Sequence, residues 1–579
     1  MLIRARLAAL LLFPILFAFP ITAQEFSPVN LPADTYFFAY SHGAGHSAAA
    51  NSASAISKGW DDPEFAQFRI QWLEYLLRHA NAQPNGLAIK PTAENAAQIM
   101  AVLESPMILG ISGSSDFFAT IQSSSTPGDD FLKRNGVFFI LDASGKTAQF
   151  DQLWSQIDAS IPPVVTRSKS EFSGVSIQHY KGPNQTTDTA RVGNYFVWST
   201  KRSVIEDLIT RLHSGSNPTE TIAKNPDFKS CQADSGTGTL LEVFFRIPDL
   251  SKIPVPPNPQ INTSAVLKGF HLDAFHAICG SMAYTPEGGR ARGAVLGDTA
   301  AGGLFSIFGS NKSQFDLLKL APPSAYSVTV GTYDLSALYR VSRSAIVSAL
   351  APEQQSSVAM VEMAGAAQLG MPIPDALALF TGEYASISLD ANVSGVPSLF
   401  AISISDPQPI LTLIHKLAAQ RIASEKQENG ITYLTFASPA PSGGPAPADS
   451  SFYLGIGPHV ILASSKAQYI REAAERLGSS GALSLADNAD VMRLRAGLPH
   501  DVMSISITDY SRFLSAIMTG VLENSAPQTS SKTSAEDAQF LESLKKFPWS
   551  AVFKTSRWSV GVMWKDSNGI HFESRSQAQ

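Results

Sequence analysis

The sequence predicts an α+β protein made of two homologous modules, each a mainly antiparallel sheet with helices packed on one of its faces. Three observations lead to this prediction. One 18-residue stretch occurs twice, other segments match in the same order around it, and strand-like segments often follow one another with no helix between them. The modules are expected at residues 24–298 and 314–579, joined by a glycine-rich linker at 299–313.

The chain begins with the features of a secretory signal peptide. Arg4 and Arg6 precede an apolar run at residues 7–21, and a small residue, Ala23, follows. We therefore expect residues 1–23 to be removed on export. The alternative is an uncleaved membrane anchor, although the run is short against the ~20 residues that a spanning helix needs.

Composition bounds the compartment and the partners. An exported protein is expected in the periplasm or outside the cell, and no later segment is long and apolar enough to predict a transmembrane span. The formal net charge is −6, only 16% of residues are charged, and no run of Lys and Arg occurs. Nucleic acid is therefore not an expected partner, and an unknown protein or other component of the cell envelope is.

The repeated stretch is YFVWSTKRSVIEDLITRL at residues 195–212 and VILASSKAQYIREAAERL at residues 460–477. In both, an apolar strand is followed by a serine and by apolar residues at helical spacing, which predicts a strand that turns sharply into an amphipathic helix. The identical positions are Ser199/Ser464, Lys201/Lys466, Ile205/Ile470, Arg211/Arg476 and Leu212/Leu477.

Four further segments match in the same order, at offsets that vary between 256 and 290 residues. Because insertions and deletions collect in surface loops, this drift is compatible with one repeated fold. The matched positions are Tyr36/Tyr326, Gly174/Gly430, Asn225/Asn488 and Gly280/Gly561.

Individual elements show both periodicities. Residues 62–79 predict a helix, with Asp62 as the N-cap and Pro63 at the first helical position. Residues 385–390 and 504–508 alternate apolar with polar side chains, which indicates strands with one face exposed to water.

These residues resemble a group of exported bacterial proteins of unknown function. Members begin the mature chain with Leu-Pro-Ala-Asp-Thr, which stands here at residues 31–35. They also carry a leucine-acid segment that leads to Leu-Pro-x-Asp and a strand ending near Asp-Tyr, here residues 485–510. The first copy departs from this pattern, with QADSGTG at residues 232–238 where Leu-Pro-x-Asp is expected. The resemblance implies an exported protein with a duplicated domain, and it implies no catalytic residue.

The weak candidates for a metal site are His42 and His46, which stand four residues apart in SHGAGHS. On a helix this spacing would place both imidazoles on one face. The neighbouring glycines disfavour a helix, so a turn after a strand is the main expectation.

No cofactor is predicted. Gly145, Lys146 and Thr147 match the end of a phosphate-binding loop, but Ile140 stands where that loop requires its first glycine. A Gly-x-Ser-x-Gly nucleophile elbow does not occur either.

Cys231 and Cys279 are the two cysteines of the chain. In an oxidising compartment a pair of cysteines is often bridged, and two separate thiols are the alternative. Neither cysteine has a counterpart in the second copy.

The function expected from these observations is non-catalytic binding or assembly in the cell envelope, because neither copy has a recognisable nucleophile or metal set. An exported hydrolase or metal-dependent enzyme is the alternative, since active sites assemble in space and not in sequence.

Overall fold

The computed structural model describes most of the chain from Phe26 to Gln577. The predicted signal peptide, His46 and Asp62 lie outside the described residues. The described residues are 26–43, 63–81, 92–113, 135–183, 185–213, 220–233, 239–248, 262–285, 288–309, 312, 315–389, 398–418, 421–436, 452–479, 481–513, 542 and 557–577.

The chain has mixed helix and strand content, as an α+β protein does, and it divides into two compact units. Unit 1 contains residues 1–254, 275–296 and 578–579, and unit 2 contains residues 255–274 and 297–577. Each unit has a main hydrophobic core of its own, around Phe38 and Ile205 in unit 1 and around Val328 and Ile470 in unit 2.

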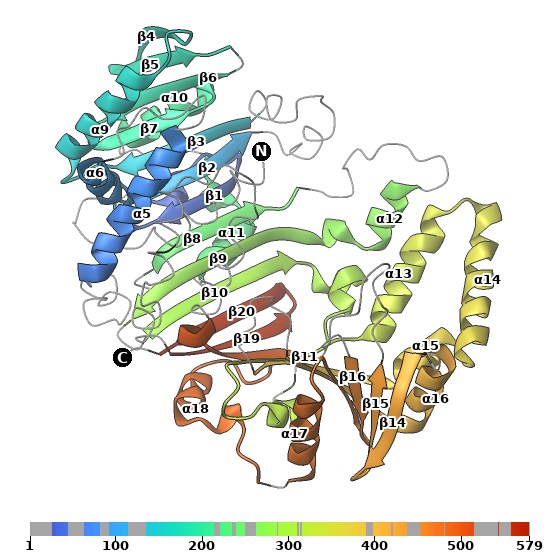
Figure 1. Ribbon diagram of the computed structural model, residues 1–579. Helices are drawn as coiled ribbons and strands as arrows, with labels where there is room; N and C mark the ends of the chain where they lie inside the picture. Colours follow the sequence, from blue (N-terminus) through green and yellow to red (C-terminus); the bar gives the residue numbers. More distant parts are fainter. Residues whose placement is uncertain are drawn as a thin grey trace, which may run out of the picture. The chain divides into compact units, whose positions relative to one another are not determined.

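Unit 1 is an antiparallel sheet whose strands lie in the order β4-β5-β6-β7-β3-β2-β1-β8-β9-β10 (Figure 1). Its strands are β1 (Thr35–Ser41), β2 (Met107–Gly113), β3 (Asn135–Asp142), β4 (Thr166–Phe172), β5 (Val175–Lys181), β6 (Thr186–Val192), β7 (Tyr195–Ser199), β8 (Thr239–Arg246), β9 (Phe275–Thr285) and β10 (Gly288–Gly297). Its described α-helices are α5 (Pro63–Asn81), α6 (Ala93–Leu103), α9 (Thr147–Ser160), α10 (Arg202–His213) and α11 (Pro226–Ala233).

The strands of unit 2 lie in the order β14-β15-β16-β17-β13-β12-β11-β18-β19-β20, again antiparallel. They are β11 (Ser327–Thr332), β12 (Phe380–Ser388), β13 (Leu399–Ile404), β14 (Ile422–Glu428), β15 (Ile431–Phe436), β16 (Phe452–Ile456), β17 (Val460–Ser464), β18 (Ser504–Asp509), β19 (Trp558–Asp566) and β20 (Gly569–Ser576). The helices are α12 (Thr263–Gly269), α13 (Leu335–Ala349), α14 (Pro352–Leu369), α15 (Ile373–Ala378), α16 (Pro407–Ala418), α17 (Ala467–Gly478) and α18 (Ala489–Ala496).

The two units therefore share one strand order, with each strand of unit 2 ten numbers above its counterpart. The register also agrees wherever the sequence matches can be compared. Ala39 pairs with Val243 and Val243 with Gly280 in unit 1. The residues at the corresponding offsets pair in the same way in unit 2, as Thr329↔Ser506 and Ser506↔Gly561.

The two matched turn glycines close equivalent hairpins. Ser173 and Gly174 join β4 to β5 with φ angles of 49° and 77°, and Asn429 and Gly430 join β14 to β15 with φ angles of 52° and 77°. Two successive positive φ angles are the geometry of a type I′ turn, which suits the twist of a two-residue hairpin. The glycine supplies the second of these angles without a steric cost.

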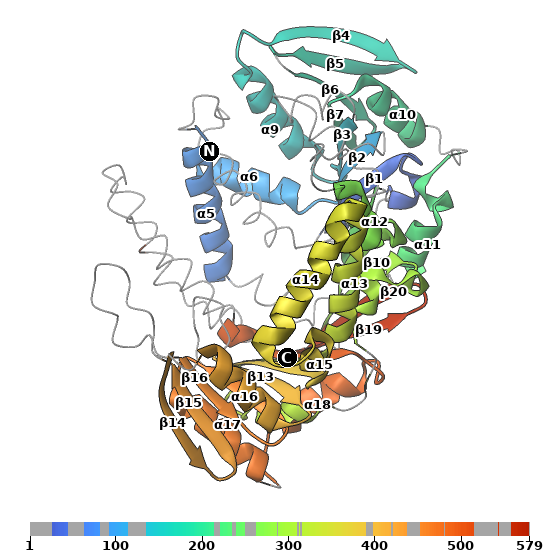
Figure 2. The ribbon, with the colours of Figure 1, turned by 90° about the vertical axis from the view of Figure 1, so that its right-hand side faces the viewer.

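Helices cover both faces of the sheet around β7, so the expectation of a single covered face is wrong. Phe196 belongs to the cluster that α9 contributes to, whereas its neighbour Val197 packs in the cluster that contains residues of α10. Figure 2 shows α9 and α10 on opposite sides of these strands. Since successive side chains of a strand point to opposite faces, an all-apolar strand such as FVW has to be buried on both.

The described part of residues 299–313, the expected linker, is packed against the second module. Phe305 is 1% exposed, and Lys565 of β19 donates hydrogen bonds from Nζ to the carbonyl oxygens of Phe305 (3.3 Å) and Phe308 (3.0 Å). The described part of residues 299–313 is therefore packed into unit 2, because its apolar side chains outweigh the flexibility of its glycines. Residues 255–274, expected in the first module, also cluster with unit 2.

Candidate functional site

A chain of polar side chains crosses three adjacent strands of unit 1. Ser170 lies on β4, His179 on β5 and Asp188 on β6, nine residues apart in each step. His179 and Asp188 face each other directly in the β5–β6 ladder, whereas Ser170 lies diagonally across from His179, two positions from the direct partner Ser168. Cross-strand and diagonal positions on one sheet face are close enough for side chains to meet.

The three side chains are joined by short hydrogen bonds. Oγ of Ser170 lies 2.6 Å from Nε2 of His179, and Nδ1 of His179 lies 2.5 Å from Oδ1 of Asp188. The Asp188 side chain is only 3% exposed, whereas that of His179 is 19% exposed. Because a carboxylate oxygen accepts, the bond to Asp188 holds the proton on Nδ1 and leaves Nε2 as the acceptor that faces the serine.

Helix α10 adds a cation to this chain. Nη1 of Arg202 lies 2.6 Å from Oγ of Ser170 and 2.6 Å from Nε2 of His179. Glu206, one turn further along the helix, accepts a hydrogen bond of 2.7 Å from Nε of the same guanidinium. The arginine is thereby directed onto the serine and the imidazole, where it can donate to a developing negative charge.

The opposite face of the same hairpin holds a second polar contact. Tyr180, next to His179, donates a hydrogen bond of 2.7 Å to Oδ1 of Asp158 on α9. Burial, together with this hydrogen bond, raises the pKa of the Tyr180 hydroxyl to about 12. Tyr180 therefore stays protonated at neutral pH and ties β5 to α9.

The four-residue cluster of Ser170, His179, Asp188 and Arg202 has no counterpart in unit 2. The positions that match it through the shared register hold Lys426, Thr435, Tyr453 and Ala467. The same hairpin and helix thus form in unit 2 from other side chains.

Of the two weak metal-site candidates, the structure describes His42. It lies directly after β1, where its Nε2 is 3.2 Å from Oε1 of Glu242 on β8 and its ring is tilted by 40° against that of Tyr40, with the centroids 4.1 Å apart. His46 lies outside the described residues. Within the part of the chain that is described, no three His, Cys, Asp or Glu side chains are grouped so that they could hold a metal ion.

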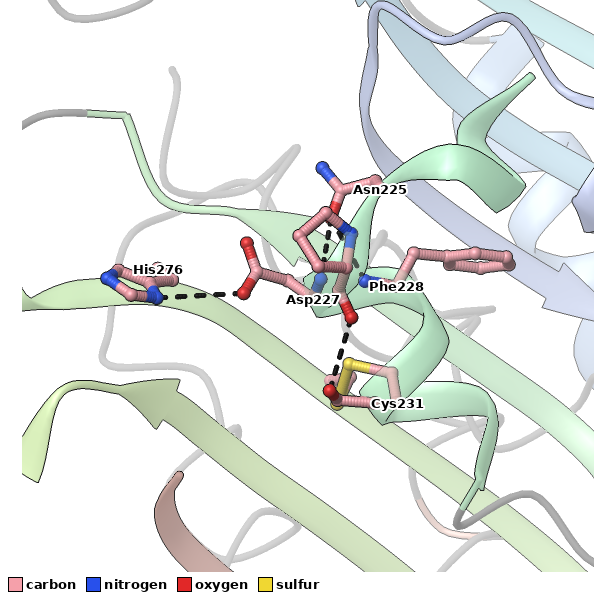
Figure 3. The surroundings of a disulfide bond; sticks show 8 residues. Asn225, Asp227, Phe228, Cys231 and His276 are labelled. Atoms are coloured by element: carbon pink, nitrogen blue, oxygen red, sulfur yellow. Dashed lines mark hydrogen bonds and ion pairs between the residues drawn. A yellow bond between two sulfur atoms is a disulfide. The ribbon is translucent and has the colours of Figure 1, made fainter. Parts of the chain in front are cut away.

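Cys231 and Cys279 form a disulfide between α11 and β9, with their Cα atoms 5.9 Å apart (Figure 3). The side chain of Asn225 caps α11 by accepting from the backbone N–H groups of Asp227 (2.8 Å) and Phe228 (3.1 Å). Nδ1 of His276 is 3.6 Å from the Asp227 carboxylate. An adjoining cavity of about 20 Å³ has room for roughly one water molecule, and the disulfide links α11 to β9 covalently beside it.

No described helix combines the length and the apolar character that crossing a membrane requires.

Comparisons with known proteins do not assign the chain to a protein family. No protein-family model and no curated protein matches the chain. Two solved structures of TP0453, in crystal forms I and III, match with TM-scores of 0.21 and sequence identities of 9% and 11%. Each match covers 47% of this chain, and 80% and 81% of the respective TP0453 chains.

Sequence reasoning missed the cluster of Ser170, His179, Asp188 and Arg202. Its only sequence signal is the spacing of nine residues on three successive strands. That spacing brings side chains together only if both hairpin registers are known, and a shift of one residue would place His179 on the other face.

Proposed function

We propose that this chain is an exported protein built by duplication of one α+β module, and that the two modules bind or assemble with another component of the cell envelope. The observation that carries the proposal is the shared strand order and register of the two units. The side chains that both copies share stabilise turns and helix ends of the fold, as expected for a binding scaffold.

The repeated side chains make the same local contacts in both units. Ser199 and Ser464 each accept a hydrogen bond of 3.1 Å from the backbone N–H of the lysine two residues later. Arg211 donates to the carbonyl of Glu220, and Arg476 donates to the carbonyl of Leu483, which occupies the same place before the next short helix. These contacts favour descent from one ancestral module.

The surface that both modules offer is an edge strand. β4 and β14 each pair with one neighbour among the described strands, and most of their side chains are exposed. Such edges accept an added strand from a partner, and their charged side chains discourage unspecific pairing. Two equivalent edges on one chain would give bivalent binding, with a gain in avidity.

Photo-cross-linking in the native envelope tests the binding role. Ser168 and Ser424 occupy equivalent, exposed positions on β4 and β14 and can each carry a photoreactive side chain. We expect both positions to cross-link the same partner, and the same group at exposed Glu353 on α14 to give none. Absence of a product at both edges, or an equal yield at Glu353, would refute binding at these edges.

Export is tested separately by N-terminal sequencing of protein recovered from the envelope or the medium. We expect the mature chain to begin near Gln24. An intact Met1 in a membrane pellet would support the uncleaved anchor instead.

A further inference from the structure

We propose that Ser170, His179, Asp188 and Arg202 form a serine nucleophile site that is acylated by carboxylic esters. This inference goes beyond the binding role and does not depend on it. It rests on a serine oxygen at 2.6 Å from an imidazole nitrogen whose other nitrogen is 2.5 Å from a buried carboxylate. That order of contacts is the geometry by which a serine hydroxyl is activated on unrelated folds.

Each side chain has a role in the reaction. The Ser170 oxygen attacks the ester carbonyl carbon while its proton passes to Nε2 of His179. Asp188 keeps the imidazole in the required orientation and stabilises the imidazolium that forms. Nε2 then returns the proton to the leaving alkoxide as the carbon–oxygen bond of the ester breaks, which leaves an acyl group on Ser170.

Water completes the cycle. It attacks the acyl carbon and gives a proton to Nε2, the bond to the Ser170 oxygen breaks, and this proton returns to that oxygen. The products are a carboxylic acid and an alcohol, so the reaction consumes only water and the ester.

Arg202 is the group that can stabilise the negative oxygen of the tetrahedral intermediate. Its Nη1 lies within 2.6 Å of both Oγ and Nε2, so it competes with the serine for the lone pair of His179 before an ester is present. An ester carbonyl oxygen next to Ser170 would offer Nη1 a new acceptor and release Nε2 to take the serine proton. Catalytic hydrogen bonds commonly rearrange in this way when a substrate binds.

A purely structural role would be to attach the β4–β5 hairpin to α10. Unit 2 argues against this role, because its equivalent hairpin and helix form with Lys426, Thr435, Tyr453 and Ala467 at these positions. The short, directed contacts of the cluster therefore call for another explanation, which the activation of Ser170 supplies.

The test uses the full chain and two probes, a fluorophosphonate that labels activated serines and p-nitrophenyl acetate. We expect one phosphonyl group per chain, located on Ser170 by peptide mass spectrometry, and turnover of the ester. S170A should abolish both. H179Q and D188N should slow both by about 100-fold or more.

Ser176 provides the matched control, because it is an exposed serine on β5, the strand that carries His179, and it makes no contact with the cluster. S176A should label and turn over like the unchanged protein. The labelled residue is identified in the unchanged protein, so a variant that fails to fold does not obscure the result. No adduct on Ser170, an equal rate in H179Q, or equal labelling of S170A and the unchanged protein would overturn the proposal.

Discussion

Ser199 and Ser464 show how one residue fixes a change of direction in the chain. Each side chain accepts from a backbone N–H two residues later, and each donates to a carbonyl, of Val137 on β3 in unit 1 and of Ser398, directly before β13, in unit 2. Both serines are buried, at 0% and 4% exposure. A buried hydroxyl that satisfies two backbone groups stabilises the turn from strand to helix.

Ser199→Ala and Ser464→Ala should each lower the free energy of unfolding by about 2 kcal/mol, because each leaves a backbone donor and a backbone acceptor without this partner. The effect is measured by urea denaturation of the single variants. Ser203→Ala, at an exposed site on α10, is the control and should change little. An equal loss in all three variants would show that the hydroxyl contacts do not stabilise the turn.

At the scale of elements, the disulfide takes the place of apolar packing. The matches at Asn225/Asn488 and Gly280/Gly561 place Leu494 and Val560 of unit 2 at the positions of Cys231 and Cys279. Both belong to the main core of unit 2, at 8% and 0% exposure. The same helix and strand are thus held by a covalent bond in one unit and by buried apolar area in the other.

Replacing both cysteines by alanine should destabilise unit 1 by about 4 kcal/mol, from the entropy of a 48-residue loop in the unfolded chain. The double variant Cys231→Leu/Cys279→Val should lose less, because it restores apolar contact of the kind that unit 2 uses. Denaturation under non-reducing conditions measures both. A loss in the leucine–valine variant as large as in the alanine variant would contradict this view of the packing.

A carboxylate of α14 is hydrogen-bonded to two side chains of α13. Glu362 accepts hydrogen bonds from Arg343 (2.5 and 3.1 Å) and from the hydroxyl of Tyr339 (2.6 Å). The Arg343 hydrogen bond, followed by that of Tyr339, lowers the pKa of Glu362 below its ordinary value of 4.5. A lowered pKa in the folded state stabilises the fold above the unfolded pKa, and this contribution is lost as the pH falls through the folded value.

Hydrogen exchange should therefore show faster opening of α13 and α14 as the pH is lowered below about 4.5, after correction for the intrinsic exchange rate. Glu362→Gln should remove this pH dependence, and α13 and α14 should then open faster at all pH values. Glu353→Gln, at the exposed start of α14, should keep the dependence of the unchanged protein. An unaltered pH profile in the Glu362 variant would exclude this carboxylate as the cause.

At the scale of the whole molecule, the two units have separate main cores in the same fold. Ile205 and Ile470 occupy equivalent positions on α10 and α17 and are 0% and 1% exposed. Each packs in the core of its own unit. Chains with more than one core commonly unfold in more than one cooperative step.

Calorimetry should show two transitions, and a matched pair of variants should assign them. Ile205→Ala should lower the midpoint temperature of one transition and Ile470→Ala that of the other. Each variant should reduce the free energy of unfolding of its own unit by about 3 kcal/mol. Reduction of the disulfide should move only the transition that Ile205→Ala moves. A single transition, or a shift of both transitions by one variant, would show that the units unfold together.

The sequence by itself determined the α+β class, the strand that turns into a helix at Ser199 and Ser464, and the hairpin turns at Gly174 and Gly430. These features depend on local chemistry: apolar periodicity, caps, and residues that tolerate positive φ angles. The matched segments also fell at equivalent places in the two strand orders.

Only the tertiary structure decided which faces are buried and which polar groups meet. Helices lie on both sides of β7, the described part of the glycine-rich stretch at 299–313 packs into unit 2, and Cys231 is bonded to Cys279. Ser170, His179 and Asp188 come together through two hairpin registers, and Arg202 reaches them from a helix that begins after a further strand. Contacts between residues distant along the chain depend on the packing of the whole sheet, which no short stretch of sequence specifies.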